Sequence, residues 1–175
     1  RPIAMAGDTE ASEKRPVDDW FVAPTWRRLE ERPIPPATPD GRWLIIGDDD
    51  GRVTAALRGA GVSDVVAGSV PADGAVTTRD GYLALLDEAT REGGPPSRIV
   101  LVLPTTLAAV ETFPEFHQVL ALAQAVVGRL AIARARIDVV VRGAASVLGD
   151  ETIRPGRAAI FGLARVVPQE YPHLR

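Results

Sequence analysis

The sequence contains no cysteine, one lysine (Lys14) and two histidines, and only 5% of its residues are aromatic. The absence of cysteine excludes a disulfide framework, a thiolate metal site and a cysteine nucleophile. A net charge of -3 provides no basic surface for nucleic acid. The sequence shows neither a membrane-spanning apolar run nor an N-terminal secretory signal. We therefore expect a soluble cytoplasmic protein with no nucleic-acid or membrane partner.

The residues that are present have ordinary globular proportions, with 46% apolar and 25% charged residues. Arginine outnumbers lysine by 19 to one, which is typical of a GC-rich bacterial genome. A chain of 175 residues can form one domain with an appended segment, but not two full-sized domains. We predict a linker over residues 1–19, an N-terminal strand and proline-rich connector over 20–41, and one α/β domain over 42–175. The strand prediction rests on the alternation of residues from Trp20 to Trp26, which is typical of an edge strand.

From Arg42 onward, short apolar runs alternate with segments of helical periodicity. The predicted strands are 42–47, 64–68, 98–103 and 137–141, and the predicted helices are 51–58, 79–92, 112–130 and 155–172. Strands joined by helices of this length pair in parallel through right-handed crossovers. The pattern therefore predicts an open, doubly wound and mostly parallel sheet, which is a truncated Rossmann-like α/β fold.

The last strand and helix organise this prediction. The β-branched run 137–141 suits a strand that is buried on both faces. Thr112 and Glu115 match a capping box at the start of the preceding helix, and Pro155 fits the first turn of the last helix. We expect a further strand to begin about where the chain stops.

The first strand leads into Gly47-Asp48-Asp49-Asp50-Gly51, the position where a dinucleotide-binding domain keeps its glycine-rich phosphate loop. The glycine spacing does not match that loop. Three carboxylates at a helix N-terminus also compete for the N–H groups that a pyrophosphate would bind. Each like-charge pair costs roughly 3 kcal/mol at about 5 Å in an effective dielectric of about 20. We predict a solvated acidic cap here and no cofactor site.

The sequence also lacks residues that two other types of reaction require. A phospho-acceptor receiver domain needs an aspartate after its central strand and a lysine after a later strand, but the only lysine is Lys14. A short-chain reductase needs a tyrosine with a lysine four residues later. Tyr82 is followed at that distance by Leu86, and Tyr171 by Arg175. We expect Tyr82 to pack at the edge of a helix.

The remaining candidate nucleophile and metal ligands are isolated in the sequence. Ser146 follows a strand but lacks the glycines of a nucleophile elbow, so it is interpreted as a turn residue. His117 and His173 are interpreted as surface residues, because two isolated histidines do not form a metal site. We predict no catalytic, cofactor-binding or metal-binding residue in this segment.

The C-terminal block carries a resemblance to a known family. Val139–Gly143 form the strand and loop of the matching pattern, and the residues that complete it are Pro155, Ala158, Gly162, Leu163, Ala164, Arg165, Val166, Glu170 and Pro172. In this order and spacing, they resemble the structural subdomain of ketoreductases in modular type I polyketide synthases. Trp20–Trp26 and Leu120–Ala125 are similar to the first strand and the long helix of that subdomain.

The resemblance implies a short-chain-dehydrogenase-like, pseudo-Rossmann scaffold that binds no cofactor itself and serves polyketide biosynthesis. Its implied partners are a catalytic ketoreductase subdomain, neighbouring synthase domains and, indirectly, an acyl carrier protein. The catalytic subdomain would bind NADPH and reduce a β-ketoacyl thioester. Two alternatives stay open: an autonomous, divergent dinucleotide-dependent reductase, and a pseudo-ketoreductase docking element in a non-reducing module.

We expect the structural and interface residues to lie mainly in the same block. They are Trp26, Arg142, Gly143, Pro155, Ala158, Gly162, Arg165 and Glu170. Gly162 would let the last helix approach a neighbouring element closely. Arg165 and Glu170 are five residues apart and need partners other than each other. Our hypothesis is that Arg142, Arg165 and Glu170 tie the last strand and helix to the loop around Gly143 or to the catalytic half.

Overall fold

The computed structural model describes residues 41–69, 78–104, 114–130 and 135–174. All of them belong to the second of two compact units, which runs from Pro33 to Arg175. The predicted linker, the predicted N-terminal strand with Trp26, and Thr112 of the predicted capping box lie outside the described residues.

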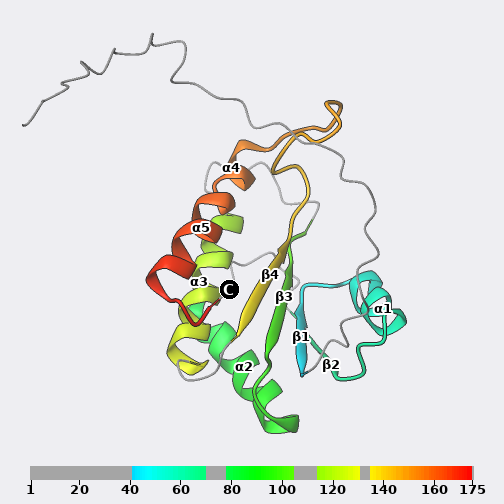
Figure 1. Cartoon of the computed structure of the whole chain (residues 1–175), viewed down its shortest axis with the longest axis vertical. Coiled ribbons are helices and arrows are strands. Elements are labelled where there is room, and N and C mark those ends of the chain that lie inside the picture. The colour runs from blue at the N-terminus through cyan, green and yellow to red at the C-terminus, as the bar shows by residue number, and fades with distance from the viewer. Residues whose placement is uncertain (1–40, 70–77, 105–113, 131–134, 175) are drawn as a thin grey trace, which may run out of the picture. The chain divides into compact units, whose positions relative to one another are not determined.

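The described chain forms four strands and five helices around one sheet (Figure 1). In chain order they are β1 (Trp43–Ile46), α1 (Arg52–Gly59), β2 (Val65–Gly68), α2 (Arg79–Gly93), β3 (Arg98–Val102), α3 (Pro114–Leu130), β4 (Arg136–Val140), α4 (Pro155–Ala158) and α5 (Ile160–Glu170). The strand order is β2-β1-β3-β4, and every neighbouring pair is parallel. The prediction of a doubly wound, parallel α/β sheet is confirmed.

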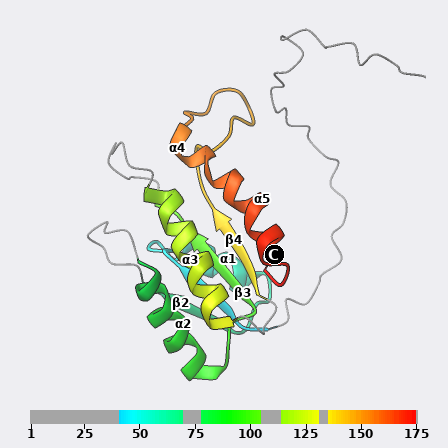
Figure 2. The same ribbon diagram turned by 90° about the vertical axis from the view of Figure 1, so that its left-hand side faces the viewer.

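The sheet is covered on both faces, because successive side chains of a strand point to opposite sides. Leu44 and Ile46 of β1 belong to the larger apolar cluster, which they share with α2, α3 and α5. Figure 2 shows these three helices on one face of the sheet. Trp43 and Ile45 point to the other face and pack with Val53 and neighbouring side chains in a smaller cluster below α1. Burial of β1 on both faces explains its continuous apolar sequence.

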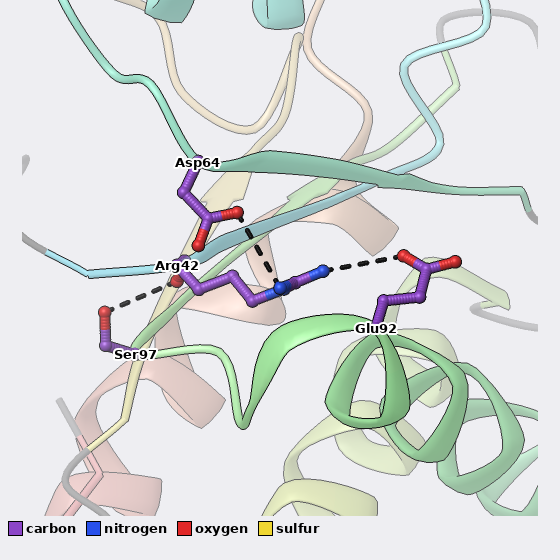
Figure 3. Close-up of polar contacts among 4 residues, drawn as sticks. All are labelled: Arg42, Asp64, Glu92 and Ser97. Atoms are coloured by element: carbon purple, nitrogen blue, oxygen red, sulfur yellow. Dashed lines mark hydrogen bonds and ion pairs between the residues drawn. The ribbon is translucent and has the colours of Figure 1, made fainter.

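Arg42 anchors the amino-terminal end of the sheet (Figure 3). Its guanidinium lies 3.8 Å from a carboxylate oxygen of Asp64 and 3.5 Å from one of Glu92, at the end of α2. The hydroxyl of Ser97 donates to the Arg42 carbonyl oxygen at 3.3 Å. Because both carboxylates are more than half exposed, these ion pairs contribute modestly to stability.

The predicted last helix is divided in the structure. It was expected to run from 155 to 172, but α4 ends at Ala158 and α5 begins at Ile160. The short α4 buries Arg157, and α5 begins by burying Ile160. α5 ends at Glu170, two residues before the expected stop at Pro172.

Two burial predictions were wrong. Tyr82 was expected at a helix edge but is completely buried in the larger cluster. β4 was expected to be buried on both faces, but it lies at one edge of the described sheet, and its Val140 is 41% exposed. An edge strand keeps one side open to solvent, which explains its partial burial.

Candidate functional site

The loops after β1, β3 and β4 meet at the carboxyl edge of the sheet, where open α/β sheets bind their ligands. They enclose a depression of about 460 Å³. Its charged lining residues are Asp48, Asp49, Asp50, Arg52 and Arg142. A dinucleotide in a Rossmann-like fold would place its pyrophosphate at this edge, at the N-terminus of α1.

Asp48 occupies the N-terminus of α1 with its own carboxylate. The two carboxylate oxygens accept hydrogen bonds from the backbone N–H groups of Val53 at 3.0 Å and Thr54 at 2.7 Å. Asp50 accepts a third, from the N–H of Arg52 at 3.1 Å. These first-turn donors are the ones that would otherwise hold an anion. The predicted acidic cap is confirmed.

The hydrogen bonds at the cap favour the charged form of Asp48. Partial burial acts to raise the pKa of its carboxyl group, but the hydrogen bonds from Thr54 and Val53 together outweigh burial, so the pKa lies below the usual 3.8. The carboxylate is therefore ionised at neutral pH. A phosphate arriving here would meet a fixed negative charge in place of free N–H donors.

A buried arginine holds the other part of this edge together. Arg157 is 2% exposed, and its Nε donates to Glu115 Oε1 at 2.9 Å. Its two terminal nitrogens donate to the carbonyl oxygens of Arg142 at 2.8 Å and Pro104 at 2.6 Å. One side chain thus links α4 with the first turn of α3 and with the chain just after β3 and β4. The three charge-assisted bonds satisfy a cation that could not otherwise be buried.

This ion pair was not predicted from the sequence. Glu115 was predicted to form a capping box with Thr112, which lies outside the described residues; in the structure Glu115 is 7% exposed and accepts from Arg157. The two residues are 42 positions apart, so no local pattern connects them. The one available signal was the position of Arg157 between Pro155 and the apolar residues that begin α5.

The loop between β4 and α4 is held by a second carboxylate. Glu151 accepts hydrogen bonds from the backbone N–H groups of Val147, Leu148 and Gly149 at 3.1, 2.8 and 3.0 Å. The hydroxyl of Ser146 also donates to it, which agrees with the prediction that Ser146 is a turn residue. The Leu148 N–H, with the other loop amides, lowers the pKa of Glu151 to about 2.

Three of the predicted structural residues shape this loop and its junction with α4. Gly143 has a φ of 70°, and an added Cβ would lie 2.9 Å from the Thr152 carbonyl oxygen, so glycine is required there. Its own carbonyl accepts from the N–H of Arg154 at 2.8 Å, which closes the loop. Pro155 occupies the first turn of α4, as predicted, and Ala158 ends that helix half-buried.

The other predicted structural residues make fewer side-chain contacts with the described chain. Arg142 contributes its carbonyl oxygen to Arg157, while its own side chain is exposed beside the acidic depression. Arg165 and Glu170 are exposed on α5, and neither side chain has a hydrogen-bond or ion-pair partner within the described ranges. Gly162 has no described atom within 4 Å of an added Cβ. Contact of these residues with a further half therefore stays a prediction.

The two histidines differ. His117 is exposed on α3, as expected. His173 was expected at the surface but is half-buried with its ring edge-on to Tyr171, because the chain turns back toward the sheet to bury Leu174. In the part of the chain that the structure describes, no group of three or more acidic, histidine or cysteine side chains could hold a metal ion. No helix among the described residues could cross a membrane.

The parallel sheet defines a Rossmann-like domain. A carboxylate of the chain occupies the N-terminus of the first helix, so the position where a phosphate usually binds is not free. The family model for the Rossmann fold domain of polyketide synthase extender module SpnB matches residues 24–174. The chain belongs to this family. The resemblance to polyketide synthase ketoreductases, inferred from the C-terminal block, is confirmed.

Similar proteins support the same assignment. The chain is 28% identical over 179 residues to polyketide synthase GfsA of Streptomyces halstedii. The aligned region covers 97% of this chain and 2% of that synthase. It matches a solved structure of A-type ketoreductases from a modular polyketide synthase with a TM-score of 0.55 and 27% identity, over 85% of this chain and 32% of that one. The chain is thus a ketoreductase-type Rossmann region that spans a small part of each relative.

Proposed function

We propose that this chain is the non-catalytic, structural half of a polyketide synthase ketoreductase. In this role it stabilises and positions a second half, which binds NADPH and reduces a β-ketoacyl thioester carried by an acyl carrier protein. Neighbouring synthase domains are its further partners.

The observation that carries the proposal is the position of the Asp48 carboxylate. It accepts from the N–H groups of Val53 and Thr54, which a bound pyrophosphate would need at the start of α1. Displacing it would break two charge-assisted hydrogen bonds and leave an anion beside the phosphates. An active dinucleotide site at this position would require a different loop.

The interior of the carboxyl edge supports a structural role as well. The side chain of Arg157 is committed to Glu115 and to two backbone carbonyls, so its charge is not available to a ligand. The described chain also lacks a tyrosine with a lysine four residues later, the proton-donating pair of short-chain reductases. Rigidity is the property that these contacts provide.

A reductase assay tests this division of labour. The chain would be expressed together with the polypeptide that follows it in the synthase, and NADPH oxidation would be followed with a β-ketoacyl thioester. We expect reduction in which Asp48→Asn leaves the KM for NADPH within about twofold, because in this proposal NADPH binds to the other half and not at the N-terminus of α1. A KM raised tenfold by Asp48→Asn, or no reduction at all, would contradict the proposal.

A further inference from the structure

A pocket of about 310 Å³ lies beside β2, the strand at the opposite edge of the described sheet from β4. Its lining combines the apolar side chains of Leu44, Leu85 and Ala89 with the carboxylates of Glu88 and Glu92. The two glutamates are four positions apart on α2, so they lie on the same side of the helix. Leu44 and Ala89 are buried, whereas both glutamates are exposed. The pocket therefore has an apolar floor and an anionic rim.

The backbone of β2 is open beside this pocket. The N–H of Trp43 donates to the carbonyl of Asp64 at 2.9 Å. In a parallel ladder, alternate residues bond to the same neighbour, so Val66 also bonds toward β1. The N–H and C=O groups of Val65 and Ala67 point to the other side, where no described strand pairs with them. Because Ala67 is exposed, another polypeptide segment can reach this edge and add a strand to the sheet.

The side chains of β2 show which face of an added strand would meet the pocket. Val66 packs against the larger apolar cluster, whereas Val65 packs against the smaller one. Gly68 follows two positions after Val66 and faces the same way, since a Cβ added to it would lie 3.6 Å from Leu85. Residues opposite each other on paired strands share a face. The residues of an added strand opposite Val66 and Gly68 therefore point toward α2 and the pocket.

The position opposite Val66 favours a basic side chain. A lysine or arginine there places its aliphatic chain on the apolar floor and its charged group between Glu88 and Glu92. Glu92 also lies 3.5 Å from the guanidinium of Arg42 (Figure 3). Glu88 has no hydrogen-bond or ion-pair partner among the residues that the structure describes. The rim thus keeps a net negative charge, which a cation from a partner would neutralise.

The position opposite Gly68 favours a large side chain. Glycine contributes no side chain of its own, so the surface beside Leu85 is left uncovered at the edge of the sheet. A large apolar or aromatic residue on the neighbouring strand covers such an edge glycine. The two positions together select a segment in which a basic and a large apolar residue are separated by one residue.

We propose that the edge of β2 is a docking surface for an extended polypeptide segment with a lysine or arginine opposite Val66 and a large apolar residue opposite Gly68. The backbone of the segment bonds to Val65 and Ala67, and its basic side chain occupies the pocket. This surface adds a protein-binding site to the domain, and the inference does not depend on which half of a ketoreductase performs the reduction.

An NMR titration of Arg1–Arg175 tests the site. The probe is a capped synthetic peptide, Thr-Tyr-Val-Lys-Val-Tyr-Thr, which has the required pattern in both strand directions. We expect the amides of Val65 and Ala67 to exchange roughly 10-fold or more slowly at saturating peptide, since exchange then requires the added strand to dissociate. The amides of Val66 and Gly68 bond toward β1 and serve as internal controls. A control peptide with glutamate in place of lysine should bind roughly 10-fold or more weakly, because like charges then meet at the rim.

A matched pair of substitutions tests the charge of the rim. Glu88→Gln should weaken binding of the lysine peptide roughly three- to tenfold at low salt, and less at high salt. Asp80→Asn removes the same charge from the same helix, about 12 Å along the axis from Glu88 and outside the pocket. This control should leave the affinity within about twofold, because the charge lies beyond a Debye length.

Three results would overturn the proposal. The first is the absence of any change at Val65 and Ala67 with the lysine peptide at millimolar concentration. The second is equal binding of the two peptides, or an equal loss from Glu88→Gln and Asp80→Asn, because the pocket would then select no cation. The third is slow exchange of Val65 and Ala67 before peptide is added, which would assign the edge to the chain itself or, if it depends on protein concentration, to a second copy. Reductase activity enters none of these results, so failure here is distinguishable from failure of the proposed function.

Discussion

Arg157 is a buried cation whose three hydrogen bonds join α3, α4 and the chain after β3 and β4. We predict that Arg157→Met lowers the free energy of unfolding by about 3–5 kcal/mol, because it leaves Glu115 buried without its counter-charge. The double variant with Glu115→Leu should lose less than the single one, since the unpaired carboxylate is gone. Urea denaturation of the three proteins measures both differences.

Arg165 provides the control for this substitution. It is exposed on α5 and makes no ion pair within the described residues. Arg165→Ala should therefore change the unfolding free energy by no more than about 0.5 kcal/mol. A loss similar to that of Arg157→Met would mean that Arg165 is bound by the chain, and our account of the buried ion pair would then be incomplete.

Glu151 gives the loop between β4 and α4 a pH dependence. Its pKa in the folded loop is about 2, below the ordinary 4.5, because the charged form accepts the loop amides. The stabilisation is therefore fully present above about pH 4.5 and is lost as the pH falls toward 2. An NMR titration of the Leu148 and Gly149 amides should show a midpoint near the lower value. A midpoint near 4.5 would show that the carboxylate does not hold the loop.

Single residues show where sequence analysis succeeds and where it cannot. The acidic cap was predicted because Asp48 lies within six positions of the N–H groups that it accepts from. The pair of Arg157 and Glu115 was missed because only the folded sheet brings α3 and α4 together. Full burial of Tyr82 likewise depends on how α2 and α3 pack over β1 and β3, which periodicity does not specify.

At the scale of elements, replacing glycine should have opposite effects on stability in the loop after β4 and in the helix α5. Gly143 has a φ of 70°, and an added Cβ would meet the Thr152 carbonyl, whereas Gly162 lies in a helix with open space around it. We predict that Gly143→Ala destabilises the chain by about 2 kcal/mol or more. Gly162→Ala should stabilise it by about 0.5–1 kcal/mol.

Thermal unfolding of the two glycine variants measures both signs. Equal effects of the two substitutions would contradict the structure of the loop. In a longer polypeptide the sign at Gly162 should reverse if α5 makes the close approach that the sequence predicts, because the added methyl group would then clash with the neighbouring element.

The elements themselves were largely predictable, and their ends and surroundings were not. Apolar runs separated by helical periodicity were enough to predict four strands and a parallel sheet. The division between α4 and α5 was not visible, since nothing local marks Ala159 as a break. The exposure of β4 was missed because a β-branched run looks the same in a central strand and in an edge strand.

At the scale of the whole molecule, two edges of the sheet differ. Side chains of the protein occupy the carboxyl edge, whereas the edge along β4 is partly exposed. At the carboxyl end, the Asp48 carboxylate occupies the N-terminus of α1, where a Rossmann-like fold binds the pyrophosphate of its cofactor, and Arg157 is paired with Glu115. Along β4, an apolar groove is lined by side chains of β4 and α5. These features are consistent with the proposed structural role, and the chain keeps the fold of its family without the glycine-rich phosphate loop.

The most direct test of this account is an NADPH titration of the chain itself, monitored by cofactor fluorescence and thermal unfolding. We predict no saturable binding and no change in stability, while a polypeptide that includes the catalytic half binds in the same experiment. Saturable binding to Arg1–Arg175, with a stabilisation of about 2.7 kcal/mol at 100 times the Kd, would contradict the structural role.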